Sequence, residues 1–148
     1  MQEKTPEDCA ALLMDTIPSI VRVIRAEMRA AGVTLLSVPQ FRTLAFLDRQ
    51  PGASLSDLAE HLGITSATAS ATVERLVQQD YVKREAHPRE RRKIVLKLTG
   101  TGIQHLQQAR TYTRRHLSAL LDGLTEQQMQ QIEVSLLLLQ HVFELRAD

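Results

Sequence analysis

The chain has 148 residues, of which 43% are hydrophobic, and its 18 basic and 17 acidic residues give a formal net charge of +1 at pH 7. These values fit one soluble globular domain and exclude a disordered or fibrous chain. The sequence contains no apolar run near the ~18–20 residues that span a bilayer. The start of the sequence lacks a secretory pattern and the single cysteine, Cys9, cannot form an internal disulfide, so we expect a cytoplasmic protein without a membrane partner.

Two helices are predicted in the first third of the chain. Thr5 is a good N-cap, and apolar residues recur at helical spacing from there to about Gly32. Pro18 interrupts this pattern, which predicts a kink or two consecutive helices. A second, short helix begins after Ser37 and closes before Pro51.

A helix-turn-helix is predicted next. Ser56 is expected to cap a brief helix over residues 57–62, which ends at a turn at Gly63. Thr65 then caps a further helix from Ser66 to about Gln79. Two helices joined by a tight glycine turn form this motif.

A β-hairpin follows the helix-turn-helix. Residues 81–85 and 93–98 are β-prone, and the second segment alternates Ile94, Leu96 and Leu98 with the residues between them. Residues 83–93 hold six basic and two acidic residues, a net charge of +4. A basic run alone is typical of a solvated surface, but this one lies on a protruding loop, which favours a polyanionic partner.

Two helices are predicted at the end of the chain. Thr99 caps a long helix, and Thr125 with Gln128 forms a capping box for the last one. The last helix has apolar residues on several faces between Met129 and Leu145, including the run Leu136 to Leu139. Because a small domain has little surface left to cover such a helix, the pattern predicts a partner chain.

The helix that begins at Ser66 is the candidate recognition element. Ala69, Val73 and Leu76 are predicted to face the core, which leaves small and hydroxyl side chains on the opposite face. A slim face of this kind fits the major groove, where Ser and Thr bond base edges or phosphates, although it is also typical of an ordinary solvated helix. The residues predicted to contact DNA here are Thr65, Ser66, Ala67, Thr68, Ser70, Ala71 and Arg75.

The hairpin tip is the second candidate element. Arg89, Arg91 and Arg92 are predicted to bind DNA, because a long planar cation suits the negative potential of a narrow minor groove. Glu90 beside them is expected to orient one guanidinium through a charge-assisted bond.

From about Leu36 to Gly102 the chain resembles the multiple-antibiotic-resistance regulator (MarR) family of winged-helix transcription factors. The segments that carry the resemblance are Pro39-Gln40-Phe41 with Leu44, Leu55 to Ile64, Thr65 to Leu76, and His87 to Arg92 running into Leu98-Thr99. The resemblance implies a mainly α-helical fold with a small β-hairpin wing, in the order helix, helix, short strand, helix, helix, strand, wing, strand, helix, helix. A single domain of residues 1–148 would hold a winged helix-turn-helix DNA-binding lobe at 36–100 and a helical dimerisation region at 5–32 and 101–148.

The resemblance also implies a function and points to departures from the family pattern. It implies a homodimeric repressor that binds double-stranded DNA at a pseudo-palindromic operator and is released by a small anionic or phenolic effector, with Arg92 as the wing arginine. Here His87 and Glu90 stand where the wing usually has aspartates, Asp80 stands where a glycine usually follows the recognition helix, and Ala71 replaces a common basic residue.

The sequence was also searched for signs of redox sensing, protein binding, catalysis and metal binding. A redox-responsive regulator acting through Cys9, or a winged-helix module that binds protein instead of DNA, stays open as an alternative. Because the sequence has no phosphate-binding glycine loop and no nucleophile motif, we expect no catalysis and no cofactor. Its five histidines show no metal-ligand spacing, so no metal site is expected.

Overall fold

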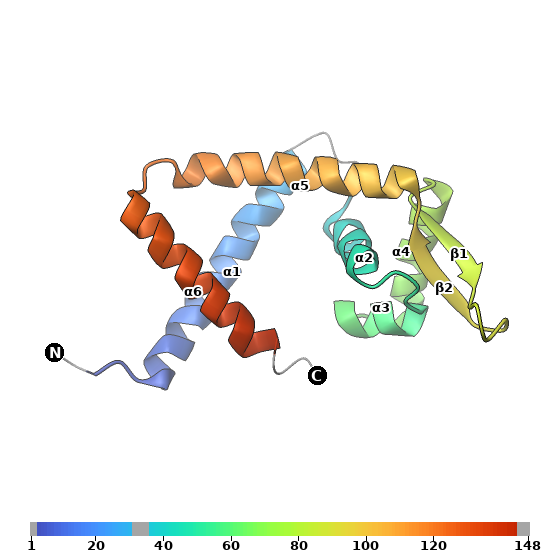
Figure 1. The fold of residues 1–148 in the computed structure, drawn as a ribbon, viewed down its shortest axis with the longest axis horizontal. Helices are drawn as coiled ribbons and strands as arrows, with labels where there is room; N and C mark the ends of the chain where they lie inside the picture. The colour runs from blue at the N-terminus through green and yellow to red at the C-terminus, as the bar shows by residue number, and fades with distance from the viewer. Residues whose placement is uncertain (1–2, 31–35, 145–148) are drawn as a thin grey trace. The chain divides into compact units, whose positions relative to one another are not determined.

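A computed structural model describes residues 3–30 and 36–144. The chain forms two compact units, Met1–Arg115 and His116–Asp148. Within the described ranges, each helix is too short or too polar to span a lipid bilayer. The elements in chain order are α1 (Pro6–Ala30), α2 (Val38–Arg49), α3 (Leu55–Leu62), α4 (Ser66–Gln78), β1 (Val82–Ala86), β2 (Ile94–Leu98), α5 (Gly100–Leu121) and α6 (Glu126–Glu144) (Figure 1).

Side-chain caps confirm the predicted starts of most helices. At α1 the Asp8 backbone N–H donates to Thr5 Oγ1 at 3.1 Å, and the Thr5 N–H donates to Asp8 Oδ2 at 2.9 Å. The Thr5 N–H and the Thr5 hydroxyl, which donates to the same Asp8 oxygen at 2.8 Å, stabilise the charged carboxylate and so lower the pKa of Asp8. The same reciprocal pairing opens α2 at Ser37 with Gln40 and α6 at Thr125 with Gln128.

Two helix predictions need correction. The first helix is continuous with Pro18 inside it, so the alternative of two consecutive helices is wrong, while the alternative of a kink at Pro18 stays a prediction. Its predicted end near Gly32 lies outside the described residues, as does Leu145 of the last helix. The predicted Ser56 cap of α3 is also wrong, because Ser54 caps this helix in a reciprocal pair with Asp57. Ser56 stands three residues before an alanine, which has no side chain to complete such a box.

The two strands form the predicted antiparallel hairpin, with Val82 opposite Leu98 and Ala86 opposite Ile94. The short strand expected before α3 consists of a single bridge between Ala53 and Leu96. The predicted alternation along β2 is wrong, because Val95 and Leu96 are both buried and Ile94 is 58% exposed. Leu96 packs in the core, while Val95 lines a groove beside the start of α3, so both faces of the strand are covered there.

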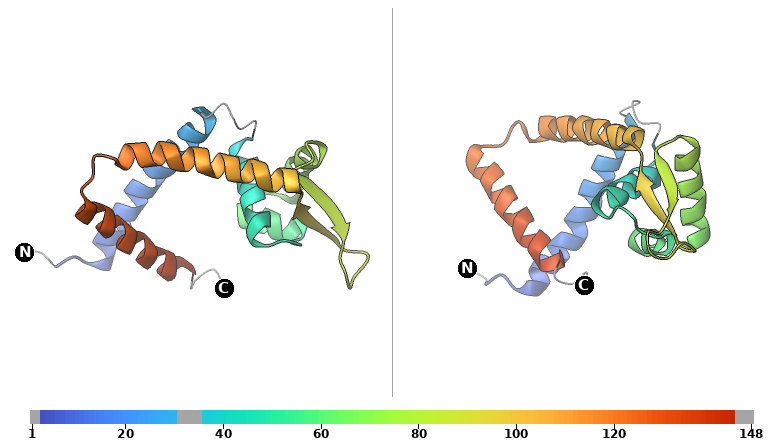
Figure 2. Two further views of the ribbon diagram at one scale, coloured as in Figure 1. Left: turned by 45° about the horizontal axis from the view of Figure 1, so that its top comes forward. Right: turned by 45° about the vertical axis from the view of Figure 1, so that its right-hand side comes forward.

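One hydrophobic core joins α2, α3, α4, the hairpin and the start of α5, and we call this assembly the winged-helix lobe. Its centre is formed by leucines without exposed surface, one from each of the four helices: Leu44, Leu58, Leu76 and Leu106. The hairpin projects beyond the helices of the lobe (Figure 2). The winged helix-turn-helix architecture predicted from the sequence is therefore confirmed.

Candidate nucleic-acid interface

The recognition helix α4 is fixed at its start by a tight turn. Gly63 ends α3 in the left-handed conformation at φ 67°, which glycine adopts without strain. Thr65 Oγ1 accepts the Thr68 backbone N–H at 3.2 Å and lies 2.9 Å from Thr68 Oγ1. The threonine hydroxyls predicted to contact phosphate thus also hold the first turn of the helix.

The structure separates the two faces of α4 as predicted. Ala69, Val73 and Leu76 are at most 1% exposed and anchor the helix in the core. All seven residues predicted to contact DNA from this helix or its cap are exposed. Their side chains are small except for that of Arg75, so the exposed face is narrow enough for a groove of B-DNA.

At the end of α4, two acidic residues have different roles. Glu74 Oε2 accepts a hydrogen bond from Arg84 Nη2 on β1 at 2.7 Å, and this bond and the guanidinium charge lower the pKa of Glu74. This ion pair braces the helix against the hairpin. Asp80, which follows the helix, has φ 61°, a left-handed conformation that glycine adopts without strain.

The wing loop, residues 87–93, is ordered by its own polar groups. His87 Nδ1 accepts the backbone N–H groups of Arg89 at 3.2 Å and Glu90 at 3.1 Å. The backbone N–H of His87 donates to the backbone carbonyl of Lys93 at 2.8 Å, which closes the loop across the two strands. His87 is therefore a structural acceptor, whereas sequence reasoning noted it only as a departure from aspartate.

Glu90 forms an ion pair with Lys93 at 3.0 Å, which lowers the pKa of its carboxyl group. The structure shows this lysine, not an arginine, as its partner. An orienting role of Glu90 toward Arg91 or Arg92 stays a prediction.

Ion pairs concentrate the free positive charge of the hairpin at its tip. Glu85 pairs with Lys83 at 3.0 Å and with Lys97 at 2.9 Å, and Arg84 and Lys93 pair with Glu74 and Glu90. Within the described ranges, the basic residues of segment 83–93 that lack an acidic partner are Arg89, Arg91 and Arg92, and all three are exposed. The net charge of the segment follows from the sequence alone. The ion pairs could not be predicted, because they depend on the register of the two strands.

Cys9 lies exposed on α1. In the part of the chain that the structure describes, no group of three potential metal-ligating side chains converges. The redox alternative rests on the exposure of this thiol alone and stays untested.

Known proteins similar to this chain are transcription regulators. The sequence model of the MarR family matches residues 32–93. The chain is 27% identical over 109 residues to the HTH-type transcriptional repressor IacR of Pseudomonas putida, across 74% of this chain and 65% of that protein. It is 29% identical over 112 residues to the HTH-type transcriptional repressor Rv2887 of Mycobacterium tuberculosis, across 75% of this chain and 81% of that protein.

The fold is also that of solved structures. A MarR family protein from Bacillus stearothermophilus superposes with a TM-score of 0.81 at 18% sequence identity, covering 95% of this chain and 99% of the other. At this identity the likeness establishes the winged-helix fold alone.

Proposed function

We propose that the chain, whose residues 32–93 match the MarR family of transcriptional regulators, is a homodimeric repressor of that family that binds a pseudo-palindromic operator. Members of the family bind DNA and typically form dimers. One observation supports DNA binding most directly: the narrow exposed face of α4 and three wing-loop arginines, which have no acidic partner among the described residues, belong to the lobe that shares one core. A helix for the major groove and a cationic loop for the minor groove are the two contacts that a winged helix makes.

The dimer is proposed from the apolar surface of α6. None of the α6 residues whose burial is described is buried, and Val134, Leu136, Leu137, Leu138 and Phe143 are each at least 55% exposed. Apolar patches of this extent are rare on soluble monomers, so a second copy of the chain is expected to cover them. In the first unit, α1 also exposes two large apolar side chains, Leu12 at 67% and Met14 at 76%.

The two-fold symmetry of such a dimer would place two α4 helices in successive major grooves, with half-sites about one helical turn apart. A small anionic or phenolic effector would release the DNA by favouring a dimer whose recognition helices have another spacing. The family suggests this mode of release.

A binding experiment on DNA from the region of the protein's own gene tests the proposal. Light scattering should give twice the chain mass of 16.6 kDa, and fluorescence anisotropy should show saturable binding to one fragment that weakens steeply with salt. A persistent monomer would contradict the architecture. A stable dimer that binds every fragment equally weakly would favour the protein-binding alternative.

A further inference from the structure

Three basic side chains from two helices of the lobe lie near one another: Arg42 and Arg49 of α2 and His61 of α3, which we call the cation cluster. Arg42 and Arg49 are seven residues apart on α2, so they lie on the same side of that helix. Arg49 Nη2 lies 3.5 Å from His61 Nε2 on α3. All three residues are exposed.

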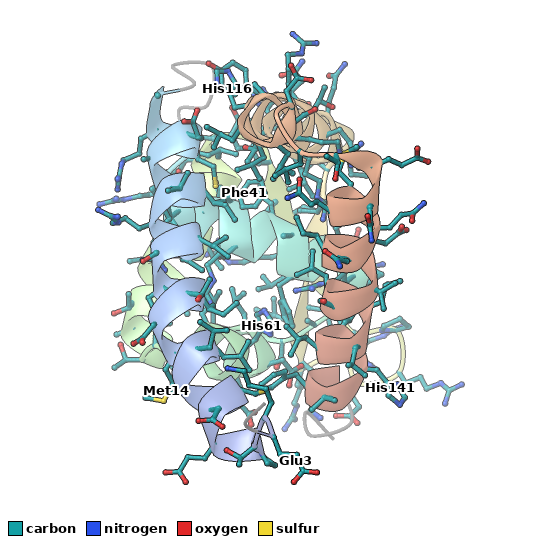
Figure 3. The ribbon with its side chains drawn as sticks, turned by 90° about the vertical axis from the view of Figure 1, so that its left-hand side faces the viewer. Glu3, Met14, Phe41, His61, His116 and His141 are labelled. Carbon is teal, nitrogen blue, oxygen red and sulfur yellow. The ribbon has the colours of Figure 1, made fainter. Side chains whose placement is uncertain are left out.

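The position of His61 within the cluster is set by the core. Its ring stacks on Phe46 with centroids 4.4 Å apart and an interplanar angle of 20°, and Phe46 is only 3% exposed. Figure 3 labels His61 on α3. Because a buried ring holds the imidazole, its Nε2 faces the guanidinium without the freedom of an ordinary surface side chain.

Within the described residues, the two guanidinium groups of the cluster form no ion pair. Asp48, next to Arg49, binds Arg110 of α5 at 2.9 Å, and Asp57 caps the start of α3. Glu60, next to His61, forms no ion pair with Arg42 or Arg49, and neither guanidinium meets any carboxylate within residues 3–30 and 36–144. Burial, then Arg49 and Arg42, lower the pKa of His61, which shows that the positive field reaches the imidazole.

We propose that the cation cluster binds a small oxyanion, a phosphate or carboxylate group, between the two guanidinium groups and His61. Guanidinium groups donate paired hydrogen bonds to such anions, and two of them on one helix face supply the charge. In the empty site the neutral imidazole accepts from Arg49 through Nε2. With the anion bound, a protonated imidazole donates from Nε2 to the anion, so anion binding and proton uptake by His61 strengthen each other.

Nuclear magnetic resonance of the His61 ring protons, titrated with pH in inorganic phosphate or in sodium chloride of equal ionic strength, tests this site on the full-length protein. Phosphate should raise the His61 titration midpoint in a saturable manner at millimolar concentration, and chloride should not. R42Q combined with R49Q should remove the phosphate effect, while R114Q on α5, which removes a charge outside the cluster, should keep it.

An unchanged midpoint in phosphate, or an equal phosphate effect in the double variant, would overturn the proposal. DNA distinguishes the two sources of the anion. If the oxyanion is a DNA phosphate, the double variant should lose DNA affinity in phosphate-free buffer; if it is a free anion, DNA affinity should stay the same while phosphate still moves His61. The phosphate titration is independent of DNA, so it stands even if the proposed repressor function fails.

Discussion

At the scale of single residues, carboxylates decide which cations remain available to a partner. Glu74, Glu85 and Glu90 each bind a basic side chain of the hairpin, and among the described residues the arginines of the wing loop have no acidic partner. The sequence predicted these arginines as candidates because their charge and loop position are local properties. It did not predict the Glu90–Lys93 pair or the role of His87 as an acceptor, because both depend on how the loop backbone turns.

Arg92→Gln should lower operator affinity about tenfold or more, since it removes an unpaired wing cation without touching the core. Anisotropy titration at one salt concentration measures the change. Arg114→Gln on α5 makes the same charge change away from the interface and should bind like the wild type. Equal affinity of both variants would exclude a wing contact by Arg92.

Gly102→Ala should destabilise the lobe by about 1–3 kcal/mol, because an added Cβ would collide with the Tyr81 backbone carbonyl where α5 meets the start of the hairpin. Denaturant unfolding measures the loss. Gly100→Ala is the matched control, since its Cβ would enter open space and helix propensity favours alanine. Similar stabilities of the two variants would show that the close approach at Gly102 is not required.

At the scale of elements, helices with local capping signals were predictable, and their boundaries depended on reciprocal caps. The boxes at Thr5, Ser37 and Thr125 are complete in the sequence, and the predicted starts are confirmed. Both Ser54 and Ser56 are possible N-caps of α3 in the sequence. Ser54 is the cap because the Asp57 side chain accepts a hydrogen bond from the Ser54 backbone N–H and completes the capping box. The burial of Val95 was unpredictable locally, because it results from a neighbouring helix.

The Glu74–Arg84 brace between α4 and β1 should make stability depend on pH in the acidic range. The folded pKa of Glu74 is lowered, so its stabilisation is complete above the unfolded pKa and is lost as pH falls through the folded pKa. Glu74→Gln should therefore be less stable than the wild type near about pH 7, and the difference should decrease as the pH falls below about 4.3, the ordinary pKa of glutamate. Thermal unfolding of both proteins across pH measures it, and a constant difference would contradict the brace.

Leu136→Glu combined with Leu138→Glu should weaken the proposed dimer about 100-fold or more, because burying unpaired carboxylates costs at least roughly 3 kcal/mol. The two positions lie about 200° apart around α6, so the pair affects whichever face the partner covers. Sedimentation equilibrium measures the dimer affinity. Gln127→Glu with Gln130→Glu adds the same charge at polar positions and should remain dimeric. A double leucine variant that still dimerises as tightly would exclude α6 from the interface.

At the scale of the whole molecule, the two compact units have different relations to the sequence. The winged-helix lobe completes its own core, and its helix-turn-helix and wing follow from local patterns. The second unit, His116–Asp148, leaves the apolar side chains of α6 exposed. Local sequence patterns predict the helix itself, but they do not predict which surface packs against it. If the proposed dimer forms through α6, DNA binding by the two winged-helix lobes would depend on the association of the two α6 helices.

Selection of bound sequences from a random double-stranded DNA library by the full-length protein tests the central claim most directly. The account predicts an enriched pseudo-palindrome with half-sites about one helical turn apart, bound on the order of 1,000-fold or more above unselected DNA. Failure of any sequence to enrich, with a properly folded dimer in the selection, would contradict a sequence-specific repressor.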